Sequence, residues 1–109
     1  MHPYDPLRFH GYVVWLTTEQ GGRQSRPPAP LVDGDYAANG FVPPLTVETG
    51  LASLIVRAST PSAYRSDADA GWLADDGRYP HEVRAGDIVV VTEGPKTIGY
   101  FHVQSISTR

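Results

Sequence analysis

Two stretches at opposite ends of the chain decide the fold. Residues 8–23 have the sequence RFHGYVVWLTTEQGGR, and residues 88–106 have the sequence IVVVTEGPKTIGYFHVQSI. Taken with their flanks, Arg8–Arg26 and Val83–Ile106 each show the pattern typical of a strand, a glycine-centred turn and a second strand. We expect the first and last strands of the chain to lie side by side, so that the two turns share one rim of the molecule.

The rest of the chain also favours short strands over helices. Its 109 residues include 11 glycines and 10 prolines, and in a helix interior proline costs about 3 kcal/mol and glycine about 1 kcal/mol. Valine, isoleucine and aromatic residues, which favour strands, fill the short apolar runs. The sequence therefore predicts an all-β fold, a small single-domain antiparallel β-barrel of about six strands, at residues 8–17, 39–48, 51–57, 79–84, 87–93 and 97–106.

The domain organisation follows from the same pattern. Residues 1–109 form one domain, in which 7–57 hold the first strands and a proline-rich loop at 24–35. Residues 58–78 are predicted to be a long polar loop, and 79–106 the closing strands. Within that polar loop, Trp72 is expected to pin the chain onto the body, with contact to a partner as the alternative. Trp15, in the first strand, is expected in the core.

Glycines in the second stretch indicate how its strands are joined. The sequence Ala85-Gly86-Asp87 predicts a turn that leads into the apolar run Ile88–Val91, which we expect to be covered on both sides. Gly94 is free to take a positive φ in the next turn. Gly99 lacks a side chain and would allow close approach of a neighbouring strand.

Composition excludes several classes of function. The chain has no cysteine and a formal net charge of −3, which excludes disulfides and thiolate metal sites and argues against a protein that coats nucleic acid. No apolar run approaches the roughly 20 residues of a membrane span. The first residues lack the basic and apolar regions of a secretory signal, so a cytoplasmic location is expected.

Both glycine-centred turns resemble those of one family. The segment Glu93-Gly94-Pro95-Lys96-Thr97-Ile98-Gly99 resembles the Glu-Gly-Gly-Arg-Thr-Val-Gly hairpin that closes the third domain of elongation factor Tu. The opening strand of the chain, followed by Glu19-Gln20-Gly21-Gly22-Arg23, resembles the first strand and the Glu-Gly-Gly-Arg turn of that domain. Both motifs occur in the order of the family and at the matching ends of the domain.

The resemblance implies a six-stranded antiparallel β-barrel without catalytic activity or cofactor. In the family, this domain contacts the T-stem of aminoacyl-tRNA and packs against protein partners. Carried over by position, Arg23, Glu93 and Gly94 correspond to the family residues at the tRNA backbone. With Gly22 beside Arg23 and the basic Lys96, they form the candidate site for RNA or a protein partner.

The chain departs from the family at important positions. Pro95 replaces the second glycine of the closing hairpin and removes a backbone N–H that could meet a phosphate. A phosphate-binding loop of the type Gly-x-x-x-x-Gly-Lys-Ser/Thr is absent from the sequence, so no nucleotide is expected to bind. Delivery of tRNA in the manner of the family does not carry over.

Other polar residues are interpreted as structural. Asp67, Asp69, Asp75 and Asp76 lack the spacing of a calcium loop and are interpreted as a solvated acidic segment. The four histidines lack a metal-ligand spacing, and His10 and His102 are interpreted as a structural pair across the closing strands. Arg23 could pair with Glu19 or Glu93, and Arg8, Arg26 and Lys96 could extend a basic patch around it. Neither a Gly-x-Ser-x-Gly motif nor a convincing Ser/His/Asp grouping is evident, so neither an enzyme nor a metal site is expected.

Three hypotheses for function stay open. The first is a non-catalytic module that binds a protein, with a role related to translation. The second is binding of structured RNA through the glycine-rich turns. The third is an immunity or antitoxin protein that copies the barrel to occupy a toxin. Partner identity and oligomeric state do not follow from the sequence.

Overall fold

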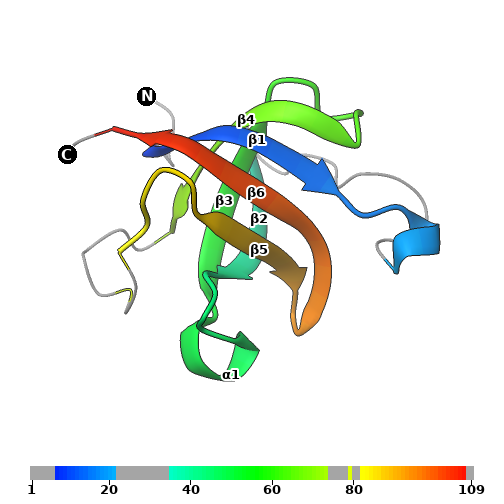
Figure 1. The fold of residues 1–109 in the computed structure, drawn as a ribbon. Coiled ribbons are helices and arrows are strands. Elements are labelled where there is room, and N and C mark those ends of the chain that lie inside the picture. The colour runs from blue at the N-terminus through cyan, green and yellow to red at the C-terminus, as the bar shows by residue number, and fades with distance from the viewer. Residues whose placement is uncertain (1–6, 22–34, 74–78, 80–81, 108–109) are drawn as a thin grey trace.

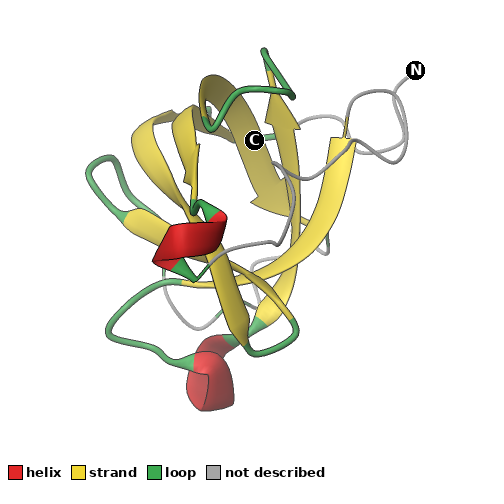
Figure 2. Ribbon diagram, turned by 90° about the vertical axis from the view of Figure 1, so that its right-hand side faces the viewer, coloured by secondary structure: helices red, strands yellow, loops and turns green. Residues whose placement is uncertain are grey.

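The described part of the protein folds into six strands. A computed structural model describes residues 7–21, 35–73, 79 and 82–107. Its elements are β1 (Phe9–Trp15), the 3₁₀ turn η1 (Thr18–Gln20), β2 (Asp35–Phe41), α1 (Val47–Gly50), β3 (Ala52–Ala58), β4 (Arg65–Trp72), β5 (Ile88–Glu93) and β6 (Lys96–Ile106). Figure 2 shows strands as the body of the molecule, with the two helical turns confined to connections.

The strands close into an antiparallel barrel in the order β1-β4-β3-β2-β5-β6 (Figure 1). The all-β fold and the six-stranded antiparallel barrel predicted from the sequence are therefore confirmed. A closed barrel gives each of its strands two neighbours, which satisfies backbone groups that an open sheet would expose at its edges.

The first and last strands lie side by side, as the sequence predicts. β1 pairs with β6 from Phe9 opposite Ile106 to Trp15 opposite Gly99. Just beyond this ladder, the Leu16 N–H donates to the Ile98 carbonyl oxygen at 2.8 Å. The end of β1 and the start of β6 therefore share one end of the barrel.

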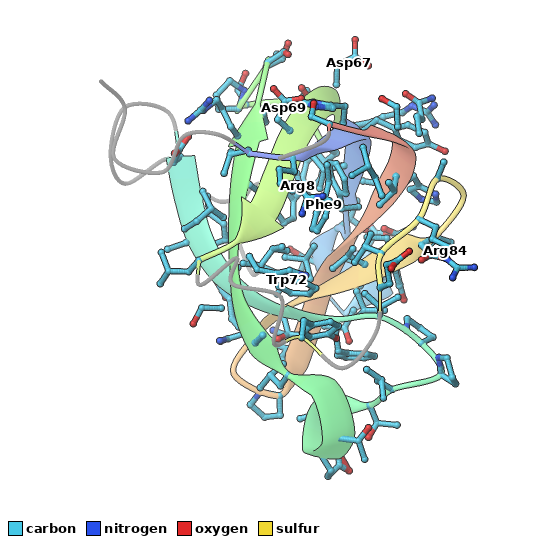
Figure 3. The ribbon with its side chains drawn as sticks, turned by 90° about the vertical axis from the view of Figure 1, so that its left-hand side faces the viewer. Arg8, Phe9, Asp67, Asp69, Trp72 and Arg84 are labelled. Atoms are coloured by element: carbon cyan, nitrogen blue, oxygen red, sulfur yellow. The ribbon has the colours of Figure 1, made fainter. Side chains whose placement is uncertain are left out.

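Apolar side chains fill the barrel interior. Alternate residues of each strand point inward because successive side chains of a strand face opposite sides. Trp15 is 3 % exposed and belongs to this core, as expected. Phe9 and Trp72 meet edge to face with ring centroids 6.0 Å apart (Figure 3). The other fully or nearly buried members are Val13, Val42, Leu54, Val56, Ala68, Ala70, Val89, Val91, Ile98, Phe101 and Val103.

One strand of the barrel lies where the sequence analysis expects a loop. Residues 65–72, inside the predicted polar loop 58–78, form β4 and pair with both β1 and β3. The reason is the alternation of this segment, because Ser66, Ala68 and Ala70 are buried while Arg65 and Asp67 are exposed. Trp72 continues the inward face and is 8 % exposed, so it is a core residue of a strand rather than a pin or a partner anchor.

Two predicted strands are placed differently. The predicted strand 39–48 is β2 at Asp35–Phe41, because Pro43 and Pro44 lack the N–H that a ladder needs and Thr46 caps the helical turn α1. The predicted strand 79–84 is wrong at its described residues, Tyr79 and 82–84, which are not in strands. β4 takes its place in the barrel. The remaining four strands agree with their predicted ranges to within two residues.

The turns around β5 and β6 match their expected roles. Asp87 donates its N–H to the Arg84 carbonyl oxygen at 3.0 Å, and Gly86 has a φ of +94°, which confirms the turn before β5. Gly94 has a φ of +59° in the β5–β6 hairpin. A Cβ on Gly99 would lie 2.8 Å from the Val14 carbonyl oxygen, so the predicted close approach of strands is confirmed. The proline-rich loop predicted at 24–35 lies outside the described residues, except for Asp35.

Candidate functional site

The residues nominated from the glycine-rich turns are only partly described. Gly22 and Arg23 lie outside the described residues, as does Arg26. Glu93 and Lys96 are opposite each other at the end of the β5–β6 hairpin. Glu93 and Lys96 therefore lie at the end of the barrel where β1 ends.

Glu93 has a structural partner. Its carboxylate accepts a hydrogen bond from the hydroxyl of Tyr36 on β2, and the Tyr36 ring meets Trp15 edge to face at 5.9 Å. This contact joins the hairpin to β2. A carboxylate would also repel a phosphate, so Glu93 is poorly suited to bind an RNA backbone.

The basic patch proposed around Arg23 does not include both Arg8 and Lys96. Arg8 precedes β1, where its Nε donates to the Ser107 carbonyl oxygen at 3.0 Å, just past the end of β6. Lys96 begins β6. Because β1 and β6 are antiparallel, these two cations lie at opposite ends of the strand pair.

An apolar and aromatic surface covers the outside of four adjacent strands, β1, β6, β5 and β2. The register aligns Val14 with Tyr100, Tyr100 with Val90, and Val90 with Phe41. A second row aligns Tyr12 with His102 and His102 with Ile88. We call this surface the aromatic face; its residues are Tyr12, Val14, Phe41, Ile88, Val90, Tyr100 and His102.

A stack of three side chains organises this face. The Tyr12 and His102 rings are nearly parallel, at 10°, with centroids 4.5 Å apart. The Arg65 Cζ atom lies 4.3 Å from the centroid of the Tyr12 ring, within the range of a cation–π contact. Burial, and secondly the charge of Arg65, lower the pKa of His102 below the ordinary histidine value. At neutral pH His102 is therefore an uncharged aromatic member of the face.

The two histidines do not form the expected pair. His102 is opposite Tyr12, whereas His10 is opposite Ser105 on β6 and Asp69 on β4. The side chains of Asp69 and His10 are hydrogen-bonded, with Oδ1 2.8 Å from Nδ1. The other ring nitrogen, Nε2, is hydrogen-bonded to the Ser107 hydroxyl.

Buried polar groups elsewhere support the fold. Asp35, 1 % exposed, accepts from Arg57 Nε at 2.6 Å and Nη2 at 3.1 Å, which fastens β2 to β3. The Tyr79 oxygen accepts the Val42 N–H at 2.9 Å, and its ring stacks on Trp72 with centroids 4.1 Å apart. Burial raises the pKa of Tyr79, although the Val42 N–H opposes the shift. Tyr79 therefore stays neutral and structural.

The acidic residues do not gather into a metal site in the described part of the chain. Asp67 and Asp69 both point outward from β4 (Figure 3), and Asp75 and Asp76 lie outside the described residues. Among the residues that the structure describes, no three histidine or carboxylate side chains are placed to hold a metal ion. The helices described are also too short to cross a membrane.

Sequence reasoning missed both the aromatic face and the hydrogen-bonded chain through His10. The face depends on register between strands about 90 residues apart, such as Tyr12 with His102. Its signal in the sequence is alternation, because Tyr12 and Val14 alternate with the core residues Val13 and Trp15, as Tyr100 and His102 do with Phe101 and Val103. The chain Asp69–His10–Ser107 depends on recognising β4 as a strand.

Comparison with protein-family models, with curated proteins and with solved structures gave no match.

Proposed function

We propose that this chain is a non-catalytic binding module that recognises a protein partner through the aromatic face. The observation that carries the proposal is the continuity of this face across four strands. Ile88 is 40 % exposed and Val90 is buried at 8 %. The other members are half-buried. Contiguous exposed apolar surface flanked by polar residues is typical of protein-interaction sites. Aromatic residues and arginine are also enriched in such interfaces.

Charge supports a protein partner over RNA. On the strand that borders the face, Asp67 and Asp69 lie outward beside Arg65. The Arg65 guanidinium is already held over the Tyr12 ring. Binding of RNA depends largely on neutralising phosphates with cations, and this surface combines few cations with carboxylates.

The proposal includes a role related to translation and a place in the cytoplasm. Support for the first is the resemblance of both glycine-centred turns to those of the third domain of elongation factor Tu. A six-stranded antiparallel barrel agrees with that resemblance. The cytoplasmic location is an expectation from the sequence alone.

An affinity pull-down from lysate of the native cells, with and without RNase, tests the proposal. Ile88→Lys places a charge at an exposed position of the aromatic face. Its matched control is Leu73→Lys, because Leu73 is 53 % exposed and lies at the opposite end of β4 from Arg65. We expect the wild type and Leu73→Lys to retain a partner protein both with and without RNase. Ile88→Lys should lose that partner.

Two outcomes would contradict this assignment. Recovery that disappears after RNase treatment would favour the RNA hypothesis. Retention of the partner by Ile88→Lys, together with its loss in Leu73→Lys, would move the interface to another part of the barrel.

A further inference from the structure

Closure of the barrel brings together a histidine and an aspartate from two strands and a serine that directly follows a third. Asp69 lies on β4 and His10 on β1, and Ser107 directly follows β6. His10 Nδ1 is 2.8 Å from Asp69 Oδ1, and His10 Nε2 is hydrogen-bonded to Ser107 Oγ. The separations along the chain are 59 and 97 residues, so only the antiparallel pairing of β1 with both neighbours brings the groups together.

The order of these contacts matches that of an activated nucleophile. A carboxylate on one ring nitrogen of histidine favours the tautomer whose proton sits on that nitrogen. With Nδ1–H donating to Asp69, Nε2 is the basic nitrogen and accepts the hydroxyl proton of Ser107. This is the hydrogen-bonding pattern by which histidine activates serine in acyl transfer.

We propose that Ser107 is a reactive nucleophile that accepts an acyl or phosphonyl group. In the step, Ser107 Oγ bonds to the electrophilic carbon of an ester while its proton passes to His10 Nε2. Collapse of the tetrahedral intermediate breaks the bond to the leaving alcohol, which takes that proton. The product is an ester of Ser107, and His10 is returned to its neutral form. Asp69 is a positioning residue, because it acts through His10.

Arg8 adds a permanent positive charge next to the nucleophile. Its Nε donates to the Ser107 carbonyl oxygen at 3.0 Å, and the Ser107 N–H donates to the Arg8 carbonyl oxygen at 2.8 Å. These two contacts fix the backbone of Ser107 against the start of β1. Arg8 is therefore a positioning residue for Ser107.

The site is open to solvent. The His10 and Asp69 side chains are 36 % and 45 % exposed. An exposed nucleophile suits small acyl donors or an acyl group presented by another macromolecule. The proposal requires a single acyl transfer and no turnover, so it is compatible with a binding module. It does not depend on the aromatic face, because none of its residues belongs to that face.

Labelling of the folded full chain with a biotinylated fluorophosphonate tests this inference. Ser107 Oγ would displace fluoride from phosphorus, and the hydroxyl proton would remain on His10. We expect one adduct per chain by intact mass, located at Ser107 by peptide sequencing. Ser107→Ala should abolish it, whereas Ser105→Ala, which removes the neighbouring hydroxyl on β6, should label at the wild-type rate.

Variants of His10 and Asp69 show whether Ser107 is activated by its partners or is merely exposed. General-base assistance accounts for about 10²–10⁴ in rate, so His10→Gln should slow labelling at least about 100-fold. Asp69→Asn should slow it by roughly tenfold or more, and Asp69→Glu should recover part of the loss because it restores a carboxylate. A merely structural role for Asp69 would not produce that recovery.

Thermal unfolding of each variant shows that the comparison is made on folded protein. The inference is overturned if folded His10→Gln labels as fast as the wild type, or if Ser107→Ala keeps its adduct. It is equally overturned if the wild-type chain is not labelled, or is labelled only after unfolding in urea.

Discussion

Gly11 is a residue at which the barrel has no room for a side chain. A Cβ there would lie 1.9 Å from the His102 carbonyl oxygen, a backbone atom of the paired strand. The register of β1 and β6 shifts between His10 and Gly11, which brings these backbones together. Alanine at this position must push the closing strands apart.

We therefore expect Gly11→Ala to destabilise the fold by about 3 kcal/mol, the upper end of typical overpacking costs. Gly94→Ala is the control, because Gly94 has a φ of +59° but no atom lies within 4 Å of the position that a Cβ would take. Gly94→Ala should lower the stability only by the strain of a left-handed backbone conformation, about 1 kcal/mol. Urea denaturation measures both, and equal losses would contradict a special close approach at Gly11.

His102 makes stability depend on pH. Its pKa in the folded state is lowered, first by burial and then by Arg65, relative to about 6.5 in an unfolded chain. As the pH falls through 6.5, the unfolded state binds more protons than the folded state, so the folded protein loses stability. Above that pH the residue is neutral in both states and contributes no pH dependence.

The measurement is the free energy of unfolding in urea between pH 8 and pH 5 at constant ionic strength. His102→Gln cannot take up the proton, so its stability should fall less steeply than that of the wild type on the acidic side. Parallel curves for the two proteins would show that His102 does not titrate differently in the two states.

At the scale of elements, the strands of valine, isoleucine and aromatic residues were predictable, and a strand of small residues was not. β5 and β6 carry runs of β-branched and aromatic residues, which favour strands. β4 buries serine and alanines instead, and its outward side carries Arg65, Asp67 and Asp69. The period of two was present in the sequence, but the low apolar content favoured a loop. Packing against bulky neighbours such as Phe9 explains why small residues suffice there.

The candidate site was less predictable than the fold because it depends on register. Alternation indicates which residues of a strand face outward, but not which residue of the next strand lies beside them. Tyr12 stacks on His102 only in the observed register, and a shift of two residues would bring a different outward residue of β6 opposite Tyr12. The same limit applies to Ser107, which reaches His10 only because β6 pairs with the whole of β1, as far as Phe9 opposite Ile106.

At the scale of the whole molecule, the barrel is closed more firmly on one side than on the other. The β1–β6 ladder includes every residue from Phe9 to Trp15. The β2–β5 ladder consists of three aligned pairs, from Asn39 opposite Thr92 to Phe41 opposite Val90. Beyond this short ladder, the hydrogen bond between Tyr36 and Glu93 joins the same two strands through side chains. Local opening should therefore begin between β2 and β5.

Hydrogen exchange followed by NMR tests this order of opening. Amides that donate across β2 and β5 should exchange faster than those that donate across β1 and β6, because less structure must open to expose them. Tyr36→Phe removes the hydroxyl bound to Glu93 but keeps the ring against Trp15. It should accelerate exchange between β2 and β5 and leave the β1–β6 amides unchanged. Tyr12→Phe is the control, since it removes a hydroxyl from the β1 side of the barrel. Equal protection of both ladders in the wild type would mean that the barrel opens as one cooperative unit, with the short ladder no weaker than the long one.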